Sequence, residues 1–178
     1  MFYEAFKYLV AVFFNVLNRL MFGNLPPFGC VGVVVEEQGR FLVVKRPEGT
    51  FVFPGGFMRW RETPEQTAIR EGKEETGLDL SIQRLICYRS APTRHPFYMS
   101  TLTLIFQASV IGGTPQSSIE GEPCWLDEET VCNSLDEFYQ PALHDYLHSR
   151  NQASSSQDTN SANKKKTYAI HTTTDNLS

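Results

Sequence analysis

Three glutamates between Gly55 and Leu78 are spaced so that their carboxylates share one helix face. Glu71, Glu74 and Glu75 stand at positions i, i+3 and i+4, which a helical turn of about 3.6 residues brings to the same side. Like charges so close repel one another and weaken an isolated helix. Magnesium or manganese relieves that repulsion and prefers such oxygen ligands. The spacing therefore indicates a divalent-metal site, although a solvated acidic face has the same pattern.

The residues around these glutamates predict a helix from Pro64 to Thr76. Thr63 is a favourable N-cap residue, and proline is well tolerated at the first helical position. Gln66 completes a T-x-x-Q capping box with Thr63. Gly77 is the residue type that commonly ends a helix in the left-handed conformation.

The wider spacing resembles the Nudix box, GX5EX7REUXEEXGU. All seven of its specified glycine, glutamate and arginine positions are matched here, by Gly56, Glu62, Arg70, Glu71, Glu74, Glu75 and Gly77. Gly72 departs from the pattern, because the family has an aliphatic residue there. Glycine inside a helix costs about 1 kcal/mol relative to alanine, so Gly72 either permits close packing on a sheet or marks a weakened motif.

The resemblance implies a fold and an activity. The fold is of the α/β class, a Nudix α/β/α sandwich with a mixed β-sheet, with the box helix on one face and a C-terminal helix on the other. The activity is Mg²⁺-dependent hydrolysis of a nucleoside diphosphate linked to another moiety, with Mn²⁺ as an alternative cation. Substrates of this class include ADP-ribose, nucleotide sugars and nucleoside triphosphates. The alternative is a catalytically weak nucleotide- or partner-binding module.

The resemblance also assigns roles within the box. It implies metal ligation by the Gly55 carbonyl and by Glu71, Glu74 and Glu75. The general base is either Glu71 or Glu120, and Glu122 is a second match for the latter position. The resemblance gives structural roles to Gly56, Glu62, Arg70 and Gly77, with Glu62 and Arg70 expected to form an ion pair between the loop and the helix.

Candidate substrate-binding residues lie outside the box. Arg46 follows Lys45 at the end of a predicted strand, where either cation is placed to contact phosphate, although an exposed strand end explains them equally well. Arg94 and Phe97 lie in a segment where Nudix enzymes often display substrate-selecting residues. We expect Arg94 to pair with phosphate and Phe97 to stack on a base, although an ordinary polar turn has the same composition. The substrate itself is not identified by any intact subfamily motif.

The chain divides into three predicted parts: residues 1–25, 26–150 and 151–178. Residues 1–22 have helical apolar spacing and form an amphipathic helix. Its longest uncharged run is shorter than the ~20 residues that cross a bilayer. It therefore packs on its own domain, forms a homodimer contact or lies on a membrane surface. The tail is rich in serine, asparagine and threonine and is expected to be disordered.

Within the central part we predict strands over residues 29–36, 40–45, 50–53, 80–90 and 98–111, a short strand at 125–126 and a closing helix over 135–149. His144 and His148 stand at i and i+4 in that helix, but no glutamate base accompanies them as in H-E-x-x-H. We interpret them as solvated side chains.

The net charge of −4 argues against a general nucleic-acid binder. It is compatible with an acidic site that meets a nucleotide-derived small molecule through a cation. The four cysteines show no C-x-x-C spacing, so they indicate neither zinc binding nor a disulfide framework. We therefore expect core thiols in a reducing compartment, with the protein cytoplasmic or peripheral at a membrane.

Overall fold

The computed structural model describes residues 2–152. The chain forms two compact units that divide between Ala142 and Leu143. The first unit holds every labelled helix and strand, and the second begins within a last helix, residues 140–152. The predicted disordered tail, 151–178, lies almost entirely outside the described residues.

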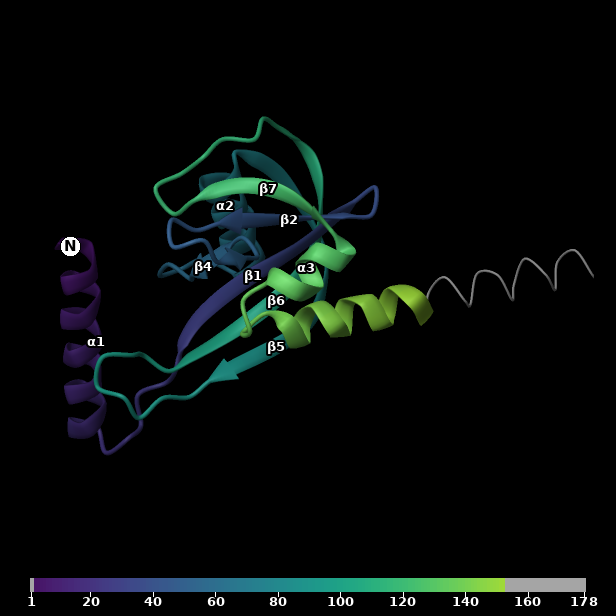
Figure 1. The fold of residues 1–178 in the computed structure, drawn as a ribbon. Helices are drawn as coiled ribbons and strands as arrows, with labels where there is room; N and C mark the ends of the chain where they lie inside the picture. The colour runs from purple at the N-terminus through teal and green to yellow at the C-terminus, as the bar shows by residue number, and fades with distance from the viewer. Residues whose placement is uncertain (1, 153–178) are drawn as a thin grey trace, which may run out of the picture. The chain divides into compact units, whose positions relative to one another are not determined.

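The first unit is built on a seven-stranded mixed sheet (Figure 1). Its main order is β3-β2-β1-β6-β5, with β4 paired to β1 and β7 paired to β2. β1 and β6 are parallel, and the other pairs are antiparallel. The strands are β1 Phe28–Glu37, β2 Arg40–Lys45, β3 Phe51–Val52, β4 Gly55–Phe57, β5 Leu78–Ala91, β6 Thr101–Gly113 and β7 Glu122–Asp127.

The central strand β1 is apolar along its whole middle because both of its faces are covered. Every residue from Cys30 to Val35 is buried, as expected for a strand that pairs in parallel and lies between two layers. On one face, Val31 and Val33 join a core cluster with Ala68 of α2. On the other face, a side chain at Gly32 would meet Ile105 and Tyr139.

The box helix α2 spans Pro64–Thr76, as predicted. Its N-terminus carries the complete capping box: Gln66 N donates to the Thr63 hydroxyl at 3.2 Å, and Thr63 N donates to Gln66 Oε1 at 2.9 Å. Gly77 ends the helix at φ 75°, in the left-handed region that residues with a Cβ rarely adopt. Both ends of α2 are therefore determined by its own sequence.

The predicted fold class is confirmed, since a mixed sheet is combined with helices as in the α/β/α sandwich. α2 and the short helix α3, Glu128–Ser134, lie on opposite sides of the sheet (Figure 1). Tyr139 packs its ring edge-to-face on Phe53 at 5.7 Å on the side away from α2. The sheet is thus covered on both faces within the first unit.

The closing helix predicted over 135–149 is present, but it begins later, at residue 140, and runs to residue 152. Helix α3, which precedes it, was not predicted, and the strand before α3 is longer than predicted. Asp127 begins α3 by accepting a hydrogen bond from Thr130 N at 2.8 Å. Leu135 then leaves the helix to form a β-bridge with Phe51, and Asp136 N donates to Phe51 O at 2.9 Å. These contacts with β3 hold residues 135 and 136 outside either helix, and local sequence does not reveal them.

Gly72 lies inside α2 where the helix meets the sheet. A Cβ at this position would overlap Leu80 Cδ1, and Leu80 is buried at 2 % exposure. Leu80 of β5 thus fills the space that an aliphatic residue at position 72 would occupy. Of the two interpretations of Gly72, the geometry supports close packing on the sheet.

The N-terminal helix α1 spans Phe2–Leu20 and packs through one face on the rest of the first unit. Ala11 is buried at 3 % exposure, and Phe14 packs edge-to-face on Phe28 at 4.7 Å. Asn15 Nδ2 donates to the carbonyls of Pro96 and Tyr98, so the segment between β5 and β6 is tied to the helix (Figure 1). Among residues 2–152, no helix is long and apolar enough to cross a membrane.

Candidate active site

The candidate site forms where α2 packs against β4. Glu75 of α2 is buried at 3 % exposure, and its Oε2 accepts a hydrogen bond from Gly55 N at 3.0 Å. The side chain of Glu120, which lies in the loop before β7, also interacts with this carboxyl and raises its pKa.

Glycines on β4 allow the helix carboxylates to approach the backbone. A Cβ at Gly56 would lie 2.6 Å from Oε1 of Glu71, and one at Gly55 would overlap the carbonyl oxygen of Val31. Any larger residue at either position would displace the carboxylate or the strand. Gly55 and Gly56 also pair with β1 as part of the short strand β4. The sequence analysis did not predict this strand.

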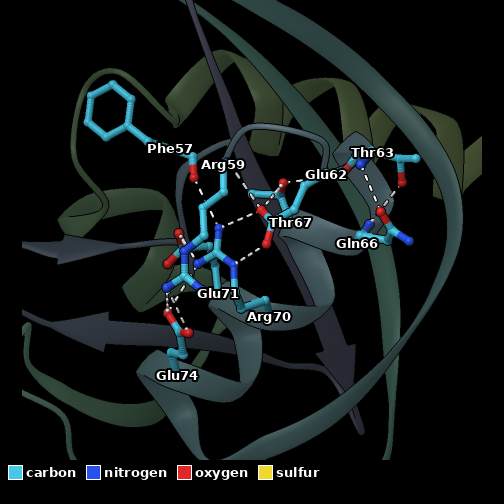
Figure 2. Close-up of polar contacts among 9 residues, drawn as sticks. All are labelled: Phe57, Arg59, Glu62, Thr63, Gln66, Thr67, Arg70, Glu71 and Glu74. Atoms are coloured by element: carbon cyan, nitrogen blue, oxygen red, sulfur yellow. Dashed lines mark hydrogen bonds and ion pairs between the residues drawn. The ribbon is translucent and has the colours of Figure 1, made fainter.

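Arg70 connects the box loop to the helix (Figure 2). Its guanidinium holds Glu62 with two bonds, 2.8 Å from Nε to Oε1 and 2.9 Å from Nη2 to Oε2. It also donates to the Phe57 carbonyl at 3.1 Å and to Glu71 Oε1 at 2.7 Å. The expected ion pair between Glu62 and Arg70 is present, and the bonds from Arg70 lower the pKa of Glu62 to about 2.

The loop between β4 and α2 is folded tightly to present Glu62. Arg59 N donates to Glu62 Oε2 at 3.1 Å, and Thr67 Oγ1 donates to the same oxygen at 2.9 Å. Arg61 adopts a φ of 75°, which residues other than glycine rarely take. Backbone strain of this kind persists only where surrounding contacts fix the loop, and the bonds to Glu62 provide them.

Glu74 lies at the rim of the site and is the most exposed of the three box-helix glutamates. Its carboxylate receives bonds from Arg59 Nη2 at 3.1 Å and from Arg70 Nη1 at 3.1 Å (Figure 2). Within residues 2–152, no group of three or more histidine, cysteine, aspartate or glutamate side chains is arranged to hold a metal ion. The arginines instead supply the positive charge, so ligation by Glu74 requires Arg59 and Arg70 to release it.

The electrostatics of the site nevertheless fit a divalent cation. Burial, together with the neighbouring Glu120 and Glu71, raises the pKa of Glu75 to about 8 against the opposing bond from Gly55 N. Burial also raises the pKa of Glu71, against the lowering effect of Arg70. Carboxyl groups that resist ionisation because they are buried together are stabilised as anions by a nearby cation. Their hard oxygens are the donors that magnesium prefers.

A cavity of about 300 Å³ opens beside Gly55 and Gly56; we call it the inner cavity. Arg46 lines it, and its Nε is buried with no hydrogen-bond partner in the described part of the chain. The Nε of Arg89 is likewise buried with no hydrogen-bond partner among the described residues. Arg89 pairs in register with Thr103, which also lines the inner cavity. Sequence reasoning missed Arg89, and only the alternation of side chains along β5 would have indicated its face.

The remaining candidate residues lie away from the cluster of Glu71, Glu75 and Gly55. Phe97 lines a second cavity, next to α1, whereas Arg94 is exposed and lines neither cavity. Glu122 is the first residue of β7 and pairs in register with Lys45. His144 and His148 are exposed, with their rings stacked at 6.3 Å.

Comparisons with known proteins agree with this geometry. Residues 26–146 match the family model described as NUDIX domain. A "MutT-like protein" of Streptomyces ambofaciens is 35 % identical over 127 residues, which cover 68 % of this chain and 79 % of that protein. An "ADP-ribose pyrophosphatase" of Methanocaldococcus jannaschii is 29 % identical over 131 residues, which cover 71 % and 77 % of the two chains.

Solved structures show the same fold. A NUDIX hydrolase of Nitrosomonas europaea superposes with a TM-score of 0.61 at 27 % identity, covering 72 % of this chain and 74 % of that one. The matched residues include the whole box, and the fold that they form is the one that places Glu71 and Glu75 against Gly55 and Gly56. The chain therefore belongs to the Nudix hydrolase family.

Proposed function

We propose that this chain hydrolyses the diphosphate linkage of a nucleoside diphosphate derivative with the help of Mg²⁺, or of Mn²⁺ in its place. The observation that carries the proposal is the packing of Glu75, Glu71 and Glu120 around Gly55 and Gly56. A purely structural cluster gains nothing from burying carboxyl groups that oppose each other's ionisation. Such a cluster is expected where a cation and a charged substrate meet.

Glu71, Glu74, Glu75 and the Gly55 carbonyl would hold the cation. When bound, it supplies positive charge against the diphosphate and Lewis-acid activation of water. Arg70 keeps Glu71 oriented through its 2.7 Å bond and fixes the loop through Glu62. Gly55 N orients the Glu75 carboxylate in the same way.

Glu120 is the proposed general base, and Glu71 is the alternative. Glu120 interacts with Glu75, so its carboxyl lies beside the cluster, where it would accept a proton from the attacking water. Glu71 Oε1 is bonded to the Arg70 guanidinium, which offsets part of the rise in the pKa of Glu71 that burial causes and leaves this oxygen less able to take a proton from water. Because Glu120 comes from a loop outside α2, it can adjust to the substrate without disturbing the helix.

Arg46 is the proposed phosphate contact in the inner cavity. Its unpartnered buried Nε is a donor that lacks compensation, and a phosphate oxygen is the acceptor that a guanidinium pairs with best. Arg89 of β5, in register with Thr103 of β6, is a second unpartnered donor on the sheet face that carries Thr103. The name of the M. jannaschii relative makes ADP-ribose the first substrate to test.

A hydrolysis panel tests the proposal directly. ADP-ribose, a nucleotide sugar, a dinucleoside polyphosphate and an oxidised nucleoside triphosphate are each incubated with the full chain and Mg²⁺ or Mn²⁺, and again with a chelator. We expect metal-dependent cleavage of one substrate well above the others. Nucleotide binding without any turnover, measured by calorimetry, would contradict hydrolysis and support the alternative of a binding module.

The outward face of α1 favours a second role, contact with another copy of the chain. Leu9, Phe13, Val16 and Leu20 are exposed and follow the three-four spacing of a helix-pairing seam. We infer a homodimer contact through this stripe, with peripheral membrane binding as the alternative. Sedimentation of Val16→Glu should show a monomer where the unchanged chain is a dimer. Flotation of the unchanged chain with anionic vesicles, and no self-association, would support the membrane instead.

A further inference from the structure

An aromatic cavity of about 700 Å³ lies between α1, β4 and the segment that joins β5 to β6. We define it by its aromatic lining residues, Phe6, Tyr8, Phe28, Phe57, Phe97 and Tyr98. They come from four separate parts of the sequence, and two of them belong to α1. The volume is within the range of small-molecule sites, roughly 300–1,000 Å³.

The rings around this cavity are arranged without closing it. Tyr8 and Phe97 meet edge-to-face at 5.7 Å across the boundary between α1 and the segment. Phe28 and Phe57 meet in the same manner at 6.3 Å on the strand side. Tyr8, Phe57 and Phe97 nevertheless remain between 44 % and 49 % exposed. Aromatic faces left in water beside a hollow are available to stack on a flat ligand.

The aromatic cavity adjoins the inner cavity. Phe57 and Thr101 line both, and Phe57 directly follows Gly55 and Gly56, against which the carboxylates pack. The inner cavity carries Arg46 and suits phosphate, whereas the aromatic cavity offers rings and suits a planar apolar group. A nucleoside diphosphate carries both kinds of group: a planar base and, one ribose away, its phosphates.

We propose that the aromatic cavity binds the base of the substrate while the inner cavity binds its phosphates, so that α1 forms one wall of the substrate site. This inference rests on the proposed function, because it assigns the nucleoside end of the same substrate. Recognition by stacking tolerates different bases, so the cavity selects a nucleotide over a sugar phosphate without selecting one base strictly. α1 lies outside residues 26–146, and substrate selection therefore depends partly on residues beyond the family domain.

Phe6 and Phe13 provide a matched test. Both are phenylalanines on α1 with 61 % exposure, but only Phe6 lines the aromatic cavity. Binding of AMP and of ribose 5-phosphate to the full chain is measured by calorimetry for the unchanged protein, Phe6→Ala and Phe13→Ala. We expect AMP affinity to fall about tenfold in Phe6→Ala and to be unchanged in Phe13→Ala. Ribose 5-phosphate, which lacks a base, should bind all three alike.

A second variant separates stacking from folding. Phe97→Leu keeps an apolar side chain of similar volume but removes the aromatic face, so it should weaken AMP binding while the melting temperature changes little. For the substrate cleaved best in the panel, Phe6→Ala and Phe97→Leu should raise KM with kcat nearly unchanged, because stacking is uniform in the ground and transition states.

The outcomes distinguish the two proposals. Equal AMP affinity in Phe6→Ala, Phe13→Ala and the unchanged chain overturns the base site, and hydrolysis in the panel can stand without it. If no substrate is cleaved but AMP binding still depends on Phe6, the cavity assignment holds and hydrolysis fails. Loss of vesicle binding in both alanine variants, with AMP affinity unaffected, would show that the aromatic residues serve a membrane surface.

Discussion

Glu75 is the residue on which the site depends most. A carboxyl group at 3 % exposure is costly unless it is hydrogen-bonded and its charge is compensated. Gly55 N provides one hydrogen bond, whereas the neighbouring Glu120 and Glu71 carry like charge and oppose ionisation of Glu75. The chain accepts this cost in the last turn of α2, beside Gly55, where the proposed cation would compensate the charge.

Glu75→Gln should lower kcat by roughly 10²- to 10⁴-fold. The substitution keeps the shape of the side chain and can still accept from Gly55 N, but it removes the charge that would hold the cation. The matched control is Glu65→Gln, on the exposed first turn of α2, which should leave kcat unchanged. Near-normal turnover of Glu75→Gln would show that the metal site is elsewhere.

The pKa of Glu75 predicts how stability varies with pH. Burial raises this pKa from 4.5 to about 8, so between these values the folded chain binds more protons than the unfolded chain. Metal-free stability should therefore fall as pH rises from about 4.5 to 8. Mg²⁺ should raise the melting temperature more at pH 8 than at pH 5.5, because protons no longer compete for the carboxylate.

Differential scanning calorimetry with chelator and with Mg²⁺ measures this dependence. Glu75→Gln, which cannot titrate at this position, is the control and should flatten both trends. A Mg²⁺-induced shift that is the same at both pH values would contradict the assignment of Glu75 as a ligand.

At the scale of elements, the contact between α2 and β5 determines how Gly72 is interpreted. Helix propensity alone marks Gly72 as a defect. The structure shows instead that its missing side chain gives room to Leu80, which is buried in the core cluster with Ala68 and Val31. Gly72 thus lowers the helix propensity of α2 but allows the helix to pack closely on the sheet.

Gly72→Ala should lower the free energy of unfolding by about 1 kcal/mol, since crowding of a packed core costs about 1–3 kcal/mol and the gain in helix propensity offsets about 1. In a Leu80→Val background the same change should be neutral or stabilising, because the overlapping Cδ1 is gone. Urea denaturation of the four proteins in this cycle measures the coupling. Additive effects of the two substitutions would show that Gly72 and Leu80 do not constrain each other.

At the scale of the whole molecule, α1 is attached to the catalytic part through few polar contacts. Asn15 Nδ2 donates to the carbonyls of Pro96 and Tyr98 at 3.1 and 2.9 Å. Asn18 Oδ1 accepts from Leu25 N at 3.1 Å and fixes the turn that follows the helix. These bonds, with the packing of Ala11 and Phe14, place α1 beside the aromatic cavity.

Asn15→Ala should release α1 from the segment between β5 and β6, at a cost of about 1 kcal/mol per lost hydrogen bond. We expect faster amide hydrogen exchange in residues 2–20 and 93–101, and a higher KM, with the rest of the sheet unchanged. Asn24→Ala removes only a local bond to Met21 O and serves as the control. Equal exchange in both variants would mean that the Asn15 bonds do not hold the helix.

The sequence by itself determined the features whose causes are local. The ends of α2 follow from Thr63, Pro64, Gln66 and Gly77, whose effects act within one turn. The box spacing brought Glu62 and Arg70 together for the same reason, because a short loop and a regular helix fix their separation. Family and fold class could therefore be predicted before any tertiary contact was known.

Only the tertiary structure decided the features that depend on contacts between distant segments. The contacts of Phe51 with Leu135 and Asp136 keep these two residues out of the closing helix, which begins later than predicted, and Leu80 explained Gly72. The sheet register sets Arg89 opposite Thr103, and helix packing sets Phe6 and Tyr8 of α1 beside Phe57 and Phe97, although these residues are far apart in the sequence. No local pattern encodes such proximity, since it results from how the whole chain buries its apolar surface.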